Sequence, residues 1–398
     1  MLNKGREVLQ IINNFGKGAE ARFVGGCVRN SLIDGAVTDI DIATNLTPDE
    51  VTHVFEKKKV RVIPTGIDFG TVTIVYEGKN YEITTLRADI ETDGRHAKVA
   101  YTKDWKEDAS RRDFTFNALY MDVEGNITDY FNGAEDIKKG LIRFIGNAED
   151  RIKEDYLRIL RMFRFHAYYG KEKILKSQLD AVKSLSDGLN AISGERIHAE
   201  MTKLLSSPNA EKTLEALTEM VSTKILQLIS NIDEKDFRIE KLKSVYDFEK
   251  EPNPIVSLAT ILCSKIPDEK IDELAEKWRL SNKELRFLFR LREALEIDFK
   301  DDYQIRRSAR INGKDEFYDY IILNYAKGRV DKAAAEKLIK FIADFAVPDF
   351  PVKSHHLIEM GIPPSKKLGD ILRKCEEMWE RDNYKPTMEE LVKRVNIN

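Results

Sequence analysis

The sequence predicts an α+β fold, with an N-terminal α/β head followed by an all-α remainder. Two observations support this prediction. Residues 21–86 mix short strand-like runs with two helix-like segments, and from about residue 148 nearly every segment has the period of a helix. The chain has 398 residues and a hydrophobic content of 42%, which is typical of a globular protein of roughly two to four domains.

The head is expected to begin with a short amphipathic helix over residues 4–15 and a first strand over residues 21–24. Thr47-Pro48-Asp49-Glu50 has the pattern of a helix start, with Thr as N-cap and Pro at the first position. Further strands are expected at residues 60–63, 71–76, 81–86, 120–123 and 127–131. Residues 87–109 have no periodicity, and we interpret them as a mobile loop.

The remainder of the chain is predicted to be helical. Residues 149–169 are expected to form one long helix. Other helices are expected at 174–187, 193–206, 209–220, 254–264, 268–278, 281–295, 315–326, 331–346, 366–381 and 387–395.

Charge and cysteine content restrict the classes of protein. The net charge is only −3, which argues mildly against a nucleic-acid partner unless a basic surface is local. No apolar run approaches the ~20 residues of a membrane span, and the first residues do not resemble a secretory leader. Cys27, Cys263 and Cys375 are odd in number and far apart, which favours a reducing cytosol.

A phosphate-binding turn is predicted at the first strand. Gly25 and Gly26 follow that strand and precede a helix-like stretch over residues 27–33. Adjacent glycines let backbone N–H groups approach a phosphate without a Cβ in the way. The helix would direct its positive end to the same place, and Arg29 would add charge-assisted hydrogen bonds.

Two carboxylates follow in the run Asp39-Ile40-Asp41-Ile42. On a strand, the two aspartates lie on one face and the two isoleucines on the other. Like charges about 7 Å apart along a strand repel each other, which favours divalent cations between them and a substrate. Carboxylates without nearby His or Cys indicate Mg²⁺. Together with the glycine turn, they indicate a metal-dependent nucleotidyl-transfer site.

A second candidate set lies in the long helix predicted over residues 149–169. Asp155 and Arg158 are three residues apart and would share a face of that helix. One interpretation is an ordinary surface ion pair. The other is base selection, because a carboxylate beside a guanidinium matches cytosine and adenine and leaves polar groups of guanine and uracil unmet. The residues alone leave both interpretations open.

Taken together, these residues resemble the class II CCA-adding enzymes, tRNA nucleotidyltransferases of the poly(A) polymerase family in the polymerase β superfamily. Five stretches match the family's motifs in order, over about residues 20–206. They are Gly25 to Asn30 with Asp39-Ile40-Asp41, Glu82 to Arg87, Arg111 to Ala118, Glu154 to Arg164, and Ser193 to Ile197. Such an ordered set is highly specific.

The resemblance implies a nucleotidyltransferase head at residues 1–138, a base-recognising helical neck at 139–206, a helical body at 207–280 and a tRNA-binding helical tail at 281–398. It implies template-independent addition of CCA to the 3′ end of tRNA from CTP and ATP. The tRNA 3′-hydroxyl would attack the α-phosphate in line and release pyrophosphate. Asp39 and Asp41 would be catalytic and bind Mg²⁺. The nucleotide would be bound by Gly26, Arg29, Arg112, Asp155, Arg158, Arg161 and Arg164.

We expect a cytoplasmic location, no membrane association and no obligatory protein partner. An A-adding-only enzyme and a bacterial poly(A) polymerase are the alternatives. Asn30 and Phe69 stand where the family usually has Asp and His, and Glu82 is a candidate third carboxylate. The resemblance also implies that the loop at residues 88–98 reshapes the pocket between C addition and A addition.

Overall fold

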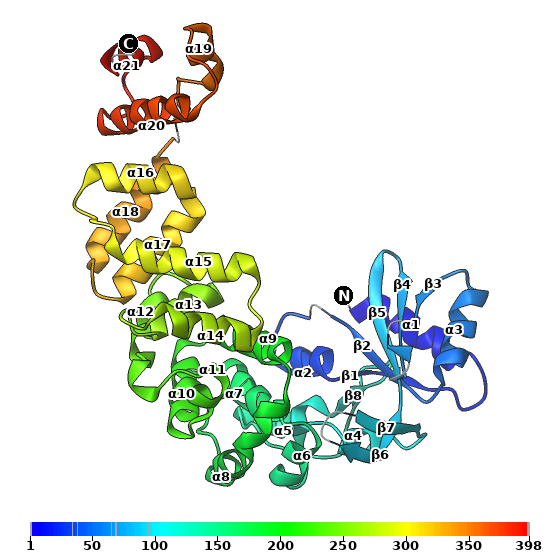
Figure 1. The fold of residues 1–398 in the computed structure, drawn as a ribbon. Coiled ribbons are helices and arrows are strands. Elements are labelled where there is room, and N and C mark those ends of the chain that lie inside the picture. Colours follow the sequence, from blue (N-terminus) through cyan, green and yellow to red (C-terminus); the bar gives the residue numbers. More distant parts are fainter. Residues whose placement is uncertain are drawn as a thin grey trace. The chain divides into compact units, whose positions relative to one another are not determined.

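The structure, a computed structural model, describes residues 2–33, 35–37, 39–64, 66–67, 70–93, 96–346 and 348–395, and their side chains except those of residues 2–3 and 89–99. The chain forms two compact units (Figure 1). Unit 1 comprises Met1–Phe237 and Ile266–Leu280, and unit 2 comprises Arg238–Lys265 and Ser281–Asn398. The division into head, neck, body and tail stays a prediction.

Unit 1 begins with a seven-stranded sheet in the order β3-β4-β5-β2-β1-β8-β9. The strands are β1 (Ala21–Val24), β2 (Asp41–Thr44), β3 (Arg61–Ile63), β4 (Thr71–Tyr76), β5 (Lys79–Thr85), β8 (Leu119–Met121) and β9 (Ile127–Asp129). Strands β2 and β5 pair in parallel, and the other neighbouring strands of this sheet pair antiparallel. The sheet carries the strands that the sequence predicts, with small shifts at their ends.

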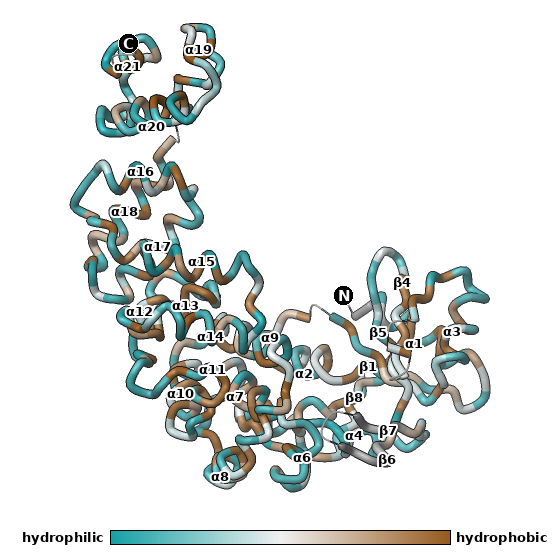
Figure 2. The backbone as a smooth tube through the Cα atoms, viewed as in Figure 1, coloured by the Kyte–Doolittle hydropathy of each residue, from teal (hydrophilic) through white to brown (hydrophobic). Residues whose placement is uncertain are grey.

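Three helices cover the head: α1 (Leu2–Asn13), α2 (Gly26–Leu32) and α3 (Pro48–Lys57). The side chain of Thr47 accepts from the Glu50 backbone, and Glu50 accepts from the Thr47 backbone, which forms a capping box at the predicted start of α3. Apolar residues of these helices pack on the strands in one buried cluster that includes Leu9, Phe23 and Phe55. The brown stretches of β1 and β4 in Figure 2 belong to this core.

The mobile loop predicted over residues 87–109 is wrong as a description of local structure. Strands β6 (Arg87–Asp93) and β7 (His96–Tyr101) pair as an antiparallel hairpin, and α4 (Trp105–Ser110) follows. The side chain of Asp104 accepts from the backbone N–H groups of Lys106 and Glu107 and caps that helix. The sequence does alternate polar and apolar residues at Arg87-Ala88-Asp89-Ile90 and at His96-Ala97-Lys98-Val99, but the alternation is short, and most of its apolar residues are small.

The other described helices of unit 1 are α5 (Gly133–Lys139), α6 (Ala148–Glu154), α7 (Leu157–Tyr169), α8 (Lys176–Leu185), α9 (Gly194–Leu205), α10 (Ala210–Ser222), α11 (Ile225–Ser230) and α14 (Asp268–Trp278). Helix α7 packs against α9 and α10. The single helix predicted over residues 149–169 is therefore wrong, because it breaks at Asp155. The Asp155 side chain accepts from the backbone N–H of Leu157, and such local bonds compete with a continuous helix.

Unit 2 is helical throughout its described residues. Its helices are α12 (Leu242–Val245), α13 (Pro254–Ile261), α15 (Asn282–Glu293), α16 (Asp302–Asn312), α17 (Lys314–Ala326), α18 (Lys332–Asp344), α19 (Ser354–Glu359), α20 (Lys366–Arg381) and α21 (Met388–Arg394). Within this unit the buried carboxylate of Glu380 on α20 pairs with Arg307 and Arg310 on α16. The predicted α+β fold with an all-α remainder is confirmed. None of the helices in the described ranges combines the length and the apolar character that crossing a bilayer requires.

Candidate active site

The turn between β1 and α2 has a backbone that glycine provides. Gly25 has φ 70° and ψ −124°, a conformation that strains residues with a Cβ, and its N–H donates to the carbonyl of Leu119 at 3.2 Å. Gly26 then begins α2, and three residues later that helix carries Arg29. The turn therefore places two glycines and an arginine side by side at the end of β1.

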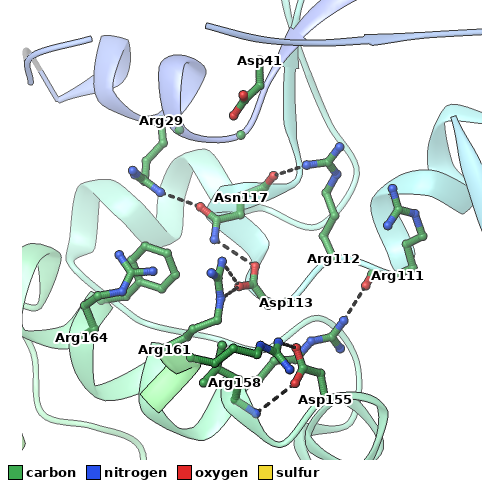
Figure 3. Close-up of a pocket in the computed structure, with 15 residues that line it drawn as sticks. Arg29, Asp41, Arg111, Arg112, Asp113, Asn117, Asp155, Arg158, Arg161 and Arg164 are labelled. Carbon is green, nitrogen blue, oxygen red and sulfur yellow. Dashed lines mark hydrogen bonds and ion pairs between the residues drawn. The ribbon is translucent and has the colours of Figure 1, made fainter. Parts of the chain in front are cut away.

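Next to this turn lies a cavity of about 420 Å³, entirely within unit 1 (Figure 3). It is lined by Gly25, Gly26, Arg29, Asp41, Arg111, Arg112, Asp113, Asn117, Asp155, Leu157, Arg158, Arg161, Arg164, Phe165 and Arg196. Eight of the nine predicted site residues are among them, and Asp39 is not. Seven arginines face three aspartates, so the cavity is strongly basic although the whole chain has a net charge of −3. The expected basic surface is thus local, and it suits a polyanion.

Asp41 is the cavity carboxylate that stands apart from the arginines. It begins β2, and the side chains of Ile40 and Ile42 are buried in the head core, so the predicted alternation places Asp41 opposite them. Asp39 precedes the strand and is exposed. Glu82 lies beside Asp41 in the parallel register of β5. Burial raises the pKa of Asp41, the charges of Glu82 and Asp39 raise it further, and Arg112 opposes them.

Six of the seven cavity arginines form ion pairs with carboxylates. The pairs are Arg111 and Arg112 with Asp108, Arg158 with Glu154, Arg161 with Asp113, Arg164 with Glu200, and Arg196 with Asp155. These carboxylates hold the guanidinium groups in fixed directions. Such fixed donors need little reorganisation when a ligand arrives.

Arg29 is the exception among the cavity arginines. It is 8% exposed, and its guanidinium donates to Asn117 Oδ1 at 2.6 Å, to Tyr169 Oη at 2.9 Å and to Asn30 Oδ1 at 3.1 Å. These partners are neutral, and no carboxylate of the described chain forms an ion pair with it. Asn30, which stands where the family usually has Asp, therefore accepts a hydrogen bond from Arg29 but forms no ion pair with it. Because a buried cation without a counter-ion is costly, Arg29 favours an anionic ligand.

Asp113 connects two of these arginines. Its carboxylate accepts from Arg161 Nε at 2.7 Å and from Asn117 Nδ2 at 2.9 Å, and Asn117 in turn holds Arg29 (Figure 3). Burial alone would raise the pKa of Asp113, but Arg161 and Asn117 outweigh it and lower the pKa to about 2. Asp113 therefore stays ionised and serves to position its neighbours.

Asp155 and Arg158 both line the cavity, but they do not form the ion pair that helix periodicity predicts. Asp155 lies at the break between α6 and α7, and its Oδ2 accepts from Arg196 Nη2 at 2.7 Å. Arg158 Nη1 donates to Glu154 Oε2 at 2.6 Å, and its Nη2 donates to the carbonyl of Arg111 at 3.0 Å. The surface ion-pair interpretation is therefore wrong, since each residue has its own partner and both face the cavity.

Comparison with known proteins identifies the family. Residues 21–143 match the poly A polymerase head domain, and residues 173–229 match a probable RNA and SrmB-binding site of polymerase A. The chain is 33% identical to a mitochondrial CCA tRNA nucleotidyltransferase 1 of Danio rerio, over 95% of this chain and 87% of that protein. This chain belongs to the CCA-adding enzymes, the class II tRNA nucleotidyltransferases.

Solved CCA-adding enzymes share the fold. The Bacillus stearothermophilus enzyme in complex with CTP superposes with a TM-score of 0.75 at 24% identity, over 99% of this chain and 97% of that one. The Thermotoga maritima enzyme complexed with tRNA superposes with a TM-score of 0.66 at 20% identity, over 99% and 94% of the two chains. The class II CCA-adding fold therefore extends over nearly the whole chain.

The set of positioning residues goes beyond the sequence prediction. Asp113 and Asn117 lie in the third CCA-adding motif and Arg196 in the fifth, so the motifs contained them without indicating a role. Asp108 is 1% exposed and pairs with Arg111 and Arg112, which follow it by three and four residues in the sequence. Glu200 is 5% exposed, and only tertiary structure brings it to Arg164. Phe69, another departure from the family pattern, lies outside the described residues.

The carboxylates near Asp41 fit the Mg²⁺ that the resemblance implies. Among the described residues, no group of three or more His, Cys, Asp or Glu side chains is arranged to hold a metal by itself. Mg²⁺ is usually held by one or two carboxylates together with substrate phosphates and water, so two aspartates are sufficient. The like charges that raise the pKa of Asp41 are the kind that a divalent cation neutralises.

Proposed function

We propose that this chain adds CCA to the 3′ end of tRNA from CTP and ATP without a nucleic-acid template. The observation that carries the proposal is the cavity itself, in which seven arginines and the Gly25-Gly26 turn adjoin Asp41. A nucleoside triphosphate has the charge and the hydrogen-bond acceptors that this lining requires. The Danio rerio relative, whose name assigns it this activity, supports the choice of substrates.

In this proposal Asp39 and Asp41 hold Mg²⁺, and Glu82 is the candidate third carboxylate. When bound, Mg²⁺ supplies neutralisation of phosphate charge and activation of the hydroxyl nucleophile. Arg29 provides the strongest phosphate contact, because its charge has no carboxylate partner in the described chain. Gly26, Arg112, Arg161 and Arg164 complete the phosphate and sugar contacts. The tRNA 3′-hydroxyl attacks the α-phosphate in line, and pyrophosphate leaves.

Asp155 and Arg158 select the base in this proposal. The carboxylate accepts from the exocyclic amine of cytosine or adenine, and the guanidinium donates to the neighbouring ring nitrogen or carbonyl. The partners that hold Arg158 use both protons of Nη1 and one of Nη2, so Nε and the second Nη2 proton remain for a base. Guanine and uracil would leave both residues with unmatched partners, which makes their rejection strong.

One assay tests the function. The full chain is incubated with Mg²⁺, labelled CTP or ATP, and tRNA that ends at the discriminator, at C or at CC, with an unrelated RNA as control. Product lengths that stop at CCA support the proposal. Addition of A alone, only to tRNA ending in CC, would identify an A-adding enzyme. Long A tails on unrelated RNA would identify a poly(A) polymerase, and no incorporation would reject the proposal.

A cytoplasmic location belongs to the proposal as well. The Danio rerio relative is a mitochondrial protein by name, so a mitochondrial location is the alternative. Fractionation of the source cells, followed by detection of the chain, tests the location.

A further inference from the structure

The carboxylate of Asp155, which selects the base in the proposed function, is held by a side chain from a third helix, α9. Asp155 has φ −156° and ψ 105°, so its backbone lies outside both α6 and α7. Its Oδ1 accepts from the backbone N–H of Leu157 at 3.1 Å, and its Oδ2 accepts from Arg196 Nη2 at 2.7 Å. Arg196 is the only side chain in the described structure that pairs with Asp155. The guanidinium of Arg196 and the backbone N–H of Leu157 therefore fix the rotation of this carboxylate together, and Arg196 is the side-chain contribution.

Arg196 comes from a helix whose start is tightly packed. It is the third residue of α9, and a Cβ on Gly194 would lie 2.3 Å from the carbonyl oxygen of Lys277 at the end of α14. One turn further along α9, Glu200 is 5% exposed, and its Oε2 accepts from Arg164 Nε at 2.5 Å. Helix α9 thus approaches α7 with an arginine for Asp155 and a carboxylate for Arg164.

Arg158, the guanidinium of the proposed base-selecting pair, is held by residues other than those that hold Asp155. Arg158 donates to Glu154 and to the carbonyl groups of Arg151 and Arg111, and none of these contacts involves α9. A change at Arg196 therefore loosens the carboxylate of Asp155 and leaves the guanidinium of Arg158 in place. This separation makes the contribution of Arg196 measurable.

We propose that Arg196 is a positioning residue for base selection, which acts by fixing the carboxylate of Asp155. This role rests on the proposed function. Arg196 stays in place when a base binds, because each carboxylate oxygen has two lone pairs and accepts a second donor. A rotated Asp155 would no longer present its acceptor at a fixed distance from Arg158, and the difference between matched and unmatched bases would shrink.

The test uses full-length Arg196→Gln and Arg196→Lys. We measure kcat and KM for CTP, UTP, ATP and GTP with tRNA acceptors, and we measure binding of CTP, UTP and inorganic tripolyphosphate by calorimetry without tRNA. In Arg196→Gln, the preference for CTP over UTP and for ATP over GTP is expected to fall about tenfold. Binding of tripolyphosphate is expected to stay unchanged. Arg196→Lys keeps the positive charge but lacks the planar array of guanidinium donors. Its discrimination between nucleotides is expected to lie between that of Arg196→Gln and that of the unaltered chain.

Lys203→Gln on the same helix is the matched control, because Lys203 is exposed and its replacement also removes one positive charge. It is expected to behave as the unaltered chain. A second check uses Asp155→Asn. If Arg196 acts through Asp155, adding Arg196→Gln to Asp155→Asn changes discrimination by less than about twofold, because coupled residues are not additive.

Two outcomes would overturn the inference. One is unchanged discrimination in both Arg196 variants. The other is an equal loss for all four nucleotides, which would assign Arg196 a purely structural role. Failure of the proposed function gives a different result, since the unaltered chain would then add no nucleotide to tRNA. Should Arg196→Gln not fold, discrimination by Arg196→Lys equal to that of the unaltered chain, with CTP and UTP binding unchanged, overturns the inference by itself.

Discussion

The aspartates of the cavity show how environment gives one residue type different roles. Asp113 has a pKa of about 2, because Arg161 and Asn117 hold its charged form. Burial and the neighbouring acids raise the pKa of Asp41 instead. Asp113 is therefore satisfied within the chain, whereas Asp41 forms no ion pair within the described residues. Pairs of acids with such opposite shifts are typical of functional sites.

Asp41→Asn is expected to reduce nucleotide incorporation by about a thousandfold or more, because the loss of a metal ligand removes several kcal/mol of transition-state stabilisation. The same variant is expected to raise the thermal stability of the metal-free protein at neutral pH. Rates with CTP and ATP, together with calorimetric unfolding, test both expectations. Near-normal turnover would remove Asp41 from the site, and Asp39→Ala tests the second carboxylate in the same way.

The pH dependence follows from the raised pKa of Asp41. The folded state binds this proton more tightly than the unfolded state, so the contribution of Asp41 to stability increases as pH falls through its folded pKa. It decreases as pH rises toward neutral. Asp41→Asn should abolish that part of the pH dependence of the metal-free protein, and an unchanged profile would contradict the assignment.

Asp155→Ala and Arg158→Ala are expected to lower the preference for CTP over UTP and for ATP over GTP by about 10- to 100-fold, since each removes hydrogen bonds to a charged group. Binding of inorganic tripolyphosphate should change less, because Arg29 and the other arginines remain. Steady-state kinetics with all four nucleotides test the selection, and calorimetry tests the phosphate contacts. Unaltered discrimination in both variants would assign them a structural role only.

Among the elements, the connection between the β6–β7 hairpin and the cavity runs through Asp108. This carboxylate on α4 accepts from the backbone N–H of Arg87 at 3.3 Å, from Arg111 Nη2 at 2.6 Å and from Arg112 Nη2 at 3.1 Å. Arg111 also donates to the carbonyl of Arg87 at 3.0 Å, and its own carbonyl accepts from Arg158. The start of the hairpin, at Arg87, is thus bonded to Arg111, whose carbonyl holds Arg158, an arginine of the proposed base-selecting pair.

Asp108→Asn is expected to destabilise unit 1 by about 3–5 kcal/mol, because it leaves two arginines without their buried counter-charge. The two arginines hold the pKa of Asp108 well below the ordinary value although burial opposes them. Its stabilisation is therefore present above about pH 4 and is lost as the pH falls below that. Denaturant unfolding at several pH values tests this. Asp180→Asn, in an exposed ion pair, is the control and should have little effect.

Replacing residues 89–98 by a short glycine-serine turn is expected to spare CC addition and to block the terminal A. In the proposed function, one pocket reads C twice and then A, and the amines of the two bases lie at different distances from the sugar. Asp155 and Arg158 must therefore shift between additions, and the hairpin base is bonded to the residues that hold Arg158. Product lengths on tRNA ending at the discriminator and at CC test the prediction, and complete CCA at a normal rate would reject it.

For the whole molecule, the two units divide the work unequally. All the residues that line the cavity belong to unit 1, and the C-terminal helices of unit 2 share a buried cluster of their own. The resemblance assigns tRNA binding to residues 281–398, which are part of unit 2. We therefore expect nucleotide and tRNA to protect different parts of the chain.

CTP with Mg²⁺ and without tRNA is expected to slow amide hydrogen exchange in unit 1. When CTP is at a hundred times its Kd, the free energy of the opening that permits exchange rises by up to about 2.7 kcal/mol. Exchange in unit 2 should stay unchanged. Hydrogen exchange followed by mass spectrometry measures both regions in one experiment, with UTP as the control nucleotide. Equal protection of both units by CTP would show that the nucleotide acts beyond its cavity.

Sequence alone established the head strands, the glycine turn, the alternation around Asp41 and most of the later helices. These features depend on local periodicity, capping and backbone freedom, which neighbouring residues determine. The ordered motifs also indicated the family, because unrelated chains rarely contain five short stretches of such specific chemistry in the same order. Eight of the nine predicted site residues then proved to line one cavity.

Only the tertiary structure decided how the charges pair. Helix periodicity placed Asp155 beside Arg158, whereas the break at Asp155 turns the carboxylate toward Arg196, 41 residues away in the chain. The hairpin of β6 and β7 escaped prediction because the alternation of polar and apolar residues in its strands is short and consists largely of small apolar residues. Arg29 is distinguished from the other cavity arginines by a lack of carboxylate partners in the described chain. The contacts of Asp155 with Arg196 and of Arg29 with Asn117 join distant elements, and no local pattern in the sequence records them.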